Sequence, residues 1–329
     1  MTKAVAMTAL TSPRLVARVK EIHRFPVKSM VGEQLQRTTL SPMGVPKDRI
    51  WALRDLDLRE ITSAKRLPGL LQCRARFLDA RSDHVEIELP SGRTITSEQG
   101  DASQVLSAEL KRNLALEPLA PASNRRHYRI GQFRGPRALR RIFGVRKGGP
   151  LPDMSVLPLS MLATLALYAT PPGTYFDVFP LHIVTTSALS ALSGAIGEEA
   201  VSVRFRPNLV IDTDGSDESF PERDWKGALH IGPAAALRIQ GETVRCGMPS
   251  HAQATGIPKA PAVVRTIYGE LDSKFGIYAS IMGVGDIAVG DRVFLSPLPR
   301  NAIQRAWDEV GDSIKRYVFK TYLSLGRGR

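Results

Sequence analysis

Hydrophobic and polar positions alternate in several short stretches of this 329-residue chain. Over 85–89, valine, isoleucine and leucine take every second place between two glutamates, and a Pro-Ser-Gly turn at 90–92 leads into a further stretch at 93–96. A period of two on both sides of a turn predicts a β-hairpin. The same pattern predicts further strands at 15–22, 201–205, 209–211, 229–231, 236–240 and 292–295.

Helical spacing is found at fewer places. We predict a helix over 104–116 and another that ends at Ser193, with Ser187 as its N-cap because a serine hydroxyl accepts a backbone hydrogen bond. Near the C-terminus, apolar residues recur every three or four positions, which predicts an amphipathic helix packed on the body of the protein. These apolar residues are Ile303, Trp307, Val310, Ile314 and Val318.

Composition restricts the class of protein. Apolar residues make up 43% of the chain and charged residues 23%, which is typical of soluble globular proteins. The longest apolar run, 156–168, is interrupted by Pro158 and is too short to cross a bilayer, so we predict no membrane span. The two cysteines, Cys73 and Cys246, lie too far apart for a disulfide framework or a CxxC zinc site, and we therefore predict a reducing, cytoplasmic location.

Positive charge exceeds negative charge by 13, which predicts an anionic partner. Much of the excess lies in one stretch bracketed by glycines and prolines: Arg125, Arg126, Arg129, Arg134, Arg137, Arg140, Arg141, Arg146 and Lys147. No recognition helix, RNP-like aromatic pair or zinc finger accompanies this stretch, so we interpret it as a solvated linker between two domains. Nucleic-acid binding and docking of an acidic protein are the alternatives.

Cys246 is the main candidate for chemistry. It follows Arg245, and a neighbouring guanidinium favours the thiolate, the form that attacks electrophiles and binds soft metals. The Gly and Pro that come next predict a bend, which places the sulfur at the end of a strand. The alternative is a buried and inert cysteine. Cys73 has no companion motif, and we interpret it as structural.

Three further clusters have residue types suited to binding an anion. In the segment 24–30, Lys28 provides a charge and Ser29 a hydroxyl, a combination that suits a phosphate. The segment 44–51 is a turn with an Asp-Arg pair ahead of a strand. The segment 204–208 has two arginines, which the strand pattern places at alternate positions before a proline. Each cluster by itself is more often structural than functional.

The order of these blocks, followed by Trp225 and Arg245-Cys246, resembles the MOSC proteins, relatives of the C-terminal domain of molybdenum cofactor sulfurase. The likeness extends over about 15–297 and is greatest to the mitochondrial amidoxime reducing component and its bacterial counterparts. It implies a mainly β fold with α elements (α+β). The implied layout is a smaller MOSC N-terminal β-barrel domain at 15–120, a basic linker at 121–152, a MOSC β-barrel domain at 153–298 and a C-terminal helical extension at 299–329.

The resemblance also implies a cofactor, molybdenum held by molybdopterin, with Cys246 as the protein ligand of the metal and the catalytic residue. By matching to the family blocks, a phosphate group would be bound by Lys28, Ser29 and Arg49, and the pterin would face Arg206 and Asn208. The remaining cofactor-lining positions implied by the family are Thr185, Thr186, Ser187, Val244 and Arg245. The resemblance also implies an association with binding of a pyridoxal phosphate-like group.

The activity implied by the resemblance is reduction of N-oxygenated compounds. Relatives of the amidoxime reducers often carry Cys-x-Arg-Cys, whereas Thr243 occupies the first position here, so the substrate site is expected to differ. No cysteine follows Cys246, so an iron–sulfur domain is not expected after it, and electrons would come from a separate reductase, ferredoxin-like or cytochrome-like protein.

Alternatives of other classes remain at this point. One is a sulfurtransferase in which Cys246 carries a persulfide, and the other is a binding module for nucleic acid or protein that keeps the fold alone. His251 is a candidate proton donor, and we interpret His182 as structural, beside a strand.

Overall fold

The computed structural model describes residues 13–131, 154, 157–213, 215, 217–254 and 256–298. Seven of the strands form a closed ring, because β1, next to last in the strand order, also pairs with β11 at the opposite end. β10 and β11 run parallel, and the other neighbours in the ring run antiparallel. The ring consists, in order, of β11 (Leu209–Asp212), β10 (Leu181–Thr185), β14 (Lys274–Gly283), β13 (Ala235–Val244), β12 (Ala228–Ile231), β16 (Arg292–Ser296) and β1 (Arg14–Arg24).

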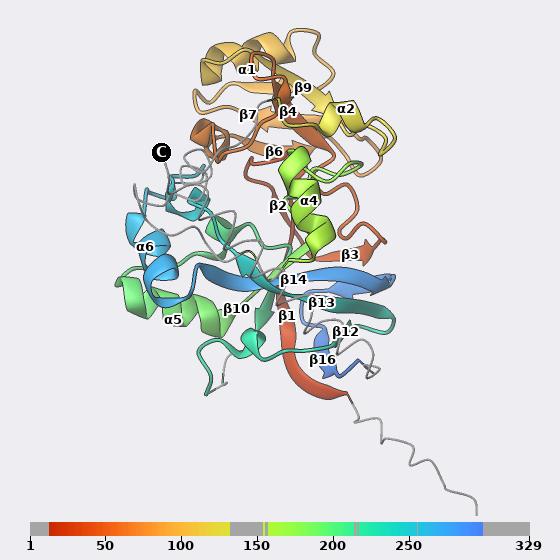
Figure 1. Ribbon diagram of the computed structural model, residues 1–329, viewed down its shortest axis with the longest axis vertical. Coiled ribbons are helices and arrows are strands. Elements are labelled where there is room, and N and C mark those ends of the chain that lie inside the picture. Colours follow the sequence, from red (N-terminus) through yellow and green to blue (C-terminus); the bar gives the residue numbers. More distant parts are fainter. Residues whose placement is uncertain are drawn as a thin grey trace, which may run out of the picture.

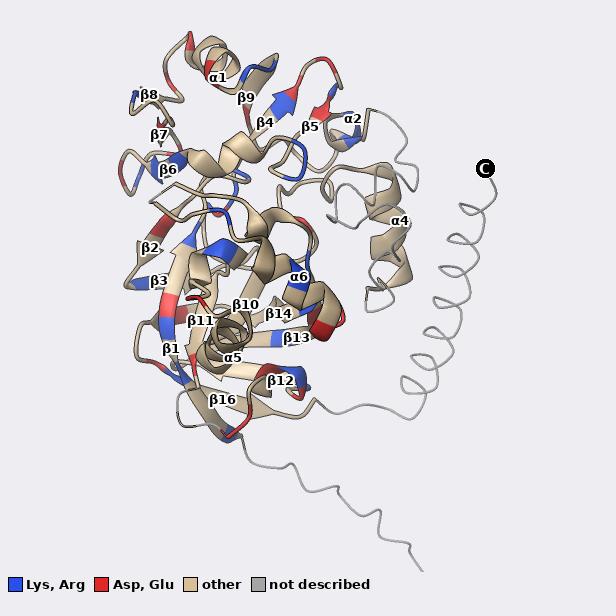
Figure 2. Ribbon diagram, turned by 90° about the vertical axis from the view of Figure 1, so that its left-hand side faces the viewer, with Lys and Arg blue, Asp and Glu red and all other residues tan. Residues whose placement is uncertain are grey.

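Alternation along the strands places one set of apolar side chains inside this barrel and another set outside it. In β10, Leu181 and Ile183 belong to the barrel core, whereas Val184 packs in a separate cluster with residues of two helices. These helices, α5 (Thr186–Ile196) and α6 (Pro261–Glu270), lie against the outside of the barrel (Figures 1 and 2). Every residue of β10 is therefore buried.

The N-terminal part forms a second, smaller β structure above the barrel in Figure 1. One of its three-stranded sheets contains β4 (Trp51–Asp55), β5 (Glu60–Ile61) and β9 (Leu114–Pro118), and the other contains β6 (Arg74–Phe77), β7 (Val85–Glu88) and β8 (Thr94–Thr96). A shared apolar core joins these sheets to α1 (Ala102–Leu110) and to the 3-10 helix η1 (Pro68–Gln72).

The two parts are connected through the start of the chain. β1 is a strand of the barrel although it precedes the N-terminal sheets along the chain. β2 (Glu33–Leu35) pairs with the end of β1 in antiparallel orientation. β3 (Arg37–Leu40) pairs with β15 (Gly285–Ala288), a strand near the other end of the chain. The remaining elements are α2 (Arg125–Tyr128), α4 (Leu159–Leu167), η2 (Ser202–Phe205), η3 (Pro221–Arg223) and η4 (Met248–Ser250).

The predicted mainly β fold with helices is confirmed, as is the hairpin formed by β7 and β8. Three local predictions were wrong. The helix over 104–116 ends at Leu110, because Lys111 adopts a left-handed conformation (φ 52°), and β9 begins at Leu114. The stretch 201–205 contains a 3-10 helix in place of a strand. The N-cap of α5 is Thr185, whose hydroxyl accepts from the N–H of Ala188.

The predicted C-terminal amphipathic helix and most of the arginine-rich stretch lie outside the described residues. Within the part of the chain that the structure describes, none of the helices combines the length and the apolar character needed to cross a membrane.

Candidate functional site

Five cationic side chains come together where the N-terminal segment crosses onto the barrel. We name Lys28, Arg49, Lys65, Arg206 and Arg245 the cation cluster, because their charges interact with one another and with Asp177. Main-chain hydrogen bonds fix the segments that carry them: Lys28 N donates to Trp51 O (2.8 Å) and Arg49 N to Phe25 O (2.7 Å). The predicted candidates Lys28, Arg49, Arg206 and Arg245 are therefore neighbours in space.

Lys28 is the most enclosed amine of the cation cluster, with 5% of its surface exposed. Its Nζ donates to the carbonyl oxygen of Tyr175 (2.8 Å) and to Asp177 Oδ1 (2.6 Å). Lys65 Nζ lies 2.8 Å from the other carboxylate oxygen of Asp177. Burial lowers the pKa of Lys28 to about 8, because Asp177 is shared between two lysines and compensates the charge of Lys28 incompletely.

Arg206 and Arg49 both lie over the ring of Phe25. Their guanidinium carbons are 4.2 Å and 4.9 Å from the ring centroid, which is cation–π geometry. One nitrogen of Arg206 donates to Met30 O, whereas its buried Nη2 has no hydrogen-bond partner among the residues that the structure describes. Burial and the nearby charge of Arg49 lower the pKa of Arg206 to about 9. A guanidinium left with an unused, buried N–H is poised to donate to an anion.

Three of the predicted site residues have backbone conformations that L-residues rarely adopt. The φ angles of Ser29, Arg49 and Arg206 are 69°, 54° and 54°. Each left-handed residue costs about 1–2 kcal/mol, and such strain is concentrated at functional sites in proteins. For Arg206, the left-handed turn ends the 3-10 helix η2 and corrects the prediction that Arg204 and Arg206 occupy alternate positions of a strand.

Asp48 and Asn208 hold the segments of the site together. Asp48 Oδ1 accepts from Phe25 N (2.7 Å), and its other oxygen accepts from Asn208 Nδ2 (2.9 Å) and from Arg49. Asn208 N donates to His182 O (2.8 Å), and Asn208 Oδ1 accepts from His182 N (3.3 Å). Asn208, predicted to face a pterin, is 1% exposed and directs its amide to other protein groups.

Cys246 follows β13 by two residues, so its predicted position at the end of a strand is confirmed. The sulfur-bearing residue is half-buried, and the charges of Lys65 and Arg245 interact with it. The guanidinium of Arg245 donates to Phe205 O (3.0 Å) and reaches His182 Nε2 (3.3 Å), while its buried Nε finds no hydrogen-bond partner within the described part of the chain. Burial and Arg245 hold the pKa of His182 well below its usual range, so this imidazole is neutral.

The other cysteine is in a different environment. Cys73 is fully buried, and burial raises the pKa of its thiol to about 12. A thiol of this kind remains protonated and inert at neutral pH.

The remaining predicted residues have local roles. Thr185 Oγ1 donates to Glu222 Oε2 (2.7 Å), Ser29 Oγ accepts from Ala64 N (3.0 Å), and Val244 ends β13 opposite Lys274. The hydroxyls of Thr186 and Ser187 bind Thr213. These hydrogen bonds of Thr185, Thr186 and Ser187 go to Glu222 and Thr213, which are outside the cation cluster. Burial lowers the pKa of His251, which leaves it neutral near pH 7.

Sequence reasoning missed Phe25, Lys65, Tyr175 and Asp177. No local motif marks the last three, because their partners are distant in sequence: Lys28 and Asp177 are 149 positions apart. Phe25 stands beside the Lys-Ser segment in sequence, but its contacts with two arginines depend on the tertiary fold.

Comparison with protein families connects this geometry to known proteins. The MOSC domain matches residues 172–294, and the MOSC N-terminal beta barrel domain matches residues 16–115. The chain belongs to the MOSC family. Its MOSC domain contains Asp177, Arg206, Arg245 and Cys246, whereas the matched N-terminal domain contributes Lys28, Arg49 and Lys65. The cation cluster is thus shared by the two family domains.

Similar solved structures include the YuaD protein of Bacillus subtilis, with 11% identity and a TM-score of 0.40 over 86% of this chain and 97% of that one. Another is YiiM of Geobacillus stearothermophilus, with 14% identity and a TM-score of 0.29 over 41% of this chain and 63% of that one. Similarities at this level do not indicate a shared function. A search of curated proteins gave no match.

MOSC proteins are associated with the molybdenum cofactor, and the chemistry of this site fits such a group. Among the described residues, no three His, Cys, Asp or Glu side chains are grouped as ligands of a metal ion. The unused Nη2 of Arg206 and Nε of Arg245 are the donors that an anionic, sulfur-rich cofactor would satisfy.

Proposed function

We propose that this protein is a molybdenum-cofactor-dependent oxidoreductase that reduces N-oxygenated compounds with electrons from a separate donor protein. The observation that carries this proposal is the cation cluster, in which two buried arginines have unused N–H groups beside a half-buried cysteine. Such a site has excess positive charge and a soft ligand, and the molybdenum cofactor provides a phosphate and a soft metal.

The residues of the chain divide into three roles. Cys246 provides the thiolate ligand to the metal. Lys28 and Arg49 bind the cofactor phosphate, and Arg206 and Arg245 offset its remaining negative charge. Each charge-assisted hydrogen bond contributes about 1.5–3 kcal/mol. When bound, the cofactor supplies a two-electron redox centre.

Reduction of an N-hydroxylated compound consumes two electrons and two protons, breaks the N–O bond and releases the amine or amidine and water. The electrons come from a separate protein, and the net positive charge of the chain favours a donor with an acidic face. Lys and Arg residues mark several loops between the N-terminal sheets and the barrel, which is where such a donor would approach the cation cluster (Figure 2).

Metal and pterin analysis of the freshly purified protein tests this proposal. We expect about one molybdenum per chain together with a pterin that becomes fluorescent on oxidation, and turnover of an amidoxime or hydroxylamine with reduced viologen as the electron donor. Absence of molybdenum from protein produced in cells that make the cofactor would contradict the proposal. Cyanide-labile sulfur on Cys246 without molybdenum would instead support a sulfur carrier.

The net positive charge of the chain leads to a prediction about nucleic acids. We expect any binding of DNA or RNA to be weak and independent of sequence, because the basic stretch lacks elements that read bases. A protein that contacts roughly 6–10 phosphates loses roughly 10³–10⁵ in affinity between about 50 and 200 mM salt. Fluorescence anisotropy with two unrelated duplexes over this range of salt checks the prediction, and sub-micromolar, sequence-selective binding at physiological salt would contradict it.

A further inference from the structure

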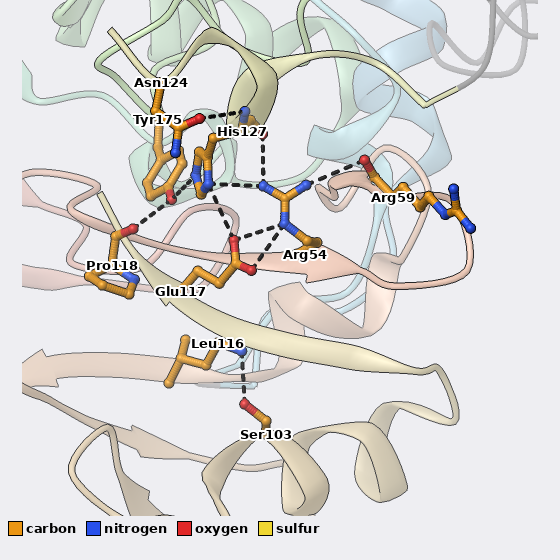
Figure 3. A network of polar contacts seen from close by, with 9 residues as sticks. All are labelled: Arg54, Arg59, Ser103, Leu116, Glu117, Pro118, Asn124, His127 and Tyr175. Carbon is orange, nitrogen blue, oxygen red and sulfur yellow. Dashed lines mark hydrogen bonds and ion pairs between the residues drawn. The ribbon is translucent and has the colours of Figure 1, made fainter. Parts of the chain in front are cut away.

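A second polar network, drawn in Figure 3, is joined to the cation cluster through Tyr175, whose main-chain carbonyl accepts from Lys28 Nζ. Arg54 on β4 binds both carboxylate oxygens of Glu117 on β9 through its Nε (3.0 and 2.9 Å). Arg54 Nη2 reaches His127 Nδ1 (3.0 Å) and donates to the carbonyl oxygen of the same residue (2.7 Å). His127 Nε2 lies 2.7 Å from the hydroxyl oxygen of Tyr175, which itself lies 2.9 Å from Pro118 O.

The donors in this network fix its protonation state. The hydroxyl of Tyr175 donates to Pro118 O, because a carbonyl only accepts, and burial raises the pKa of this phenol so that it stays protonated. His127 must therefore donate from Nε2 to the tyrosine oxygen, and its Nδ1 accepts from Arg54. This arrangement requires a neutral imidazole, and burial and Arg54 lower the pKa of His127 accordingly.

Tyr175 connects this network to the cation cluster. Its ring is fully buried beside Tyr128, in a cluster formed with residues of the N-terminal part. Its main-chain carbonyl accepts from Lys28 Nζ, and Asp177, two residues further on, binds Lys28 and Lys65. Tyr175 follows a turn in which Thr174 N donates to Pro171 O (3.1 Å). Anchoring the side chain of Tyr175 therefore sets the position of the Tyr175 carbonyl and the Asp177 carboxylate, the two groups that bind Lys28 Nζ.

We propose that Tyr175 and His127 are positioning residues that hold the segment 175–177 against Lys28 and so keep the cation cluster arranged for an anionic ligand. This inference deepens the proposed function and rests on it for the identity of the ligand. The arrangement of Lys28 itself does not depend on that identity. Removing the hydroxyl of Tyr175 would break two hydrogen bonds in the N-terminal part and loosen the carbonyl and carboxylate contacts of Lys28.

The test measures the reactivity of Lys28 in the full-length protein. Acylation by an amine-specific reagent is followed by peptide mass spectrometry, with Lys274 of the same chain as an internal reference, since its amine binds Glu242 (3.1 Å) away from the network. In Tyr175→Phe we expect Lys28 to react about 5- to 150-fold faster than in the wild type, because each of the two lost hydrogen bonds has a net value of about 0.5–1.5 kcal/mol. Molybdenum should also be lost faster on dialysis.

Tyr128→Phe is the matched control. Its hydroxyl donates to Ala120 O within the same apolar cluster, but its main chain does not bind Lys28.

His127→Ala should resemble Tyr175→Phe, and His127→Gln should restore most of the protection because its amide can donate to the tyrosine oxygen. Equal Lys28 reactivity in Tyr175→Phe and Tyr128→Phe would overturn the proposal, as would identical effects of the two His127 variants. If the wild type binds no molybdenum, the proposed function fails while the reactivity of Lys28 still decides this inference.

The network also predicts an effect of pH on stability. The pKa of His127 is lowered in the folded state, so its contribution to stability is complete above about pH 6.5, the usual value of the unfolded chain, and is lost as the pH falls through the folded pKa. Protonated Nδ1 would face Arg54, with Glu117 as the nearby counter-charge and the rings of Tyr128 and Tyr175 on other sides. Urea unfolding at pH 7.5 and 5.5 should show a smaller loss of stability in His127→Gln than in the wild type; an equal loss would contradict this.

Discussion

Replacing Cys246 with serine is expected to abolish reduction of a model amidoxime or hydroxylamine, whereas Cys73→Ser leaves it unchanged. Serine has nearly the same size but offers a hard oxygen with a far higher pKa, which is a poor ligand for molybdenum. Changes to groups that merely support a metal ligand typically cost roughly 10–100-fold in affinity or activity, so loss of the ligand should cost at least roughly 100-fold. The measurement is turnover with reduced methyl or benzyl viologen, which bypasses the unidentified donor protein.

Cys73→Ser is the matched control because it makes the same chemical change in a different environment. Cys73 is fully buried in the core of the N-terminal part, so its replacement is expected to lower the free energy of unfolding and to leave turnover per molybdenum unchanged. Wild-type turnover by Cys246→Ser with molybdenum bound would show that the ligand is wrongly assigned. Wild-type protein that holds the cofactor but reduces no N-oxygenated compound would favour the sulfur carrier.

The double replacement Lys28→Ala and Arg49→Ala is expected to remove most of the cofactor from the purified protein. Two charge-assisted hydrogen bonds of about 1.5–3 kcal/mol each correspond to a loss of roughly 10²–10⁴ in affinity. The effect on folding should be smaller, because both carboxylates keep a partner: Asp177 retains Lys65, and Asp48 retains Asn208. Molybdenum and pterin content, together with the melting temperature, measure the two effects separately.

Lys47→Ala is the control for this double variant. Lys47 lies two residues before Arg49 and also has a positive φ (62°), but its amine binds the carbonyls of Ala80 and Ser82 at the surface. We expect its cofactor content to equal that of the wild type. Full occupancy in the double variant would show that the phosphate is bound elsewhere on the chain.

Local patterns in the sequence were sufficient for several elements. The hairpin at 85–96 was predictable because strand alternation and turn residues act between neighbours, and the pairing of β7 with β8 needs no distant partner. The helix over 104–116 was predicted too long, because the spacing of apolar residues continued after Lys111 had already left the helical conformation. The pattern at 201–205 indicated a strand, yet a 3-10 helix there ends in the left-handed Arg206.

For the site, the sequence by itself determined which functional groups the chain can offer to a ligand. The adjacent Arg245 and Cys246, the Lys-Ser pair at 28–29 and Arg49 are local features, and their residue types already indicate an anion and a soft metal. The tertiary structure decided which of these groups meet. It closed the barrel with β1, placed Asp177 between two lysines, and stacked two arginines on Phe25. These contacts join residues far apart along the chain, so they follow from packing of the whole fold and not from any local pattern.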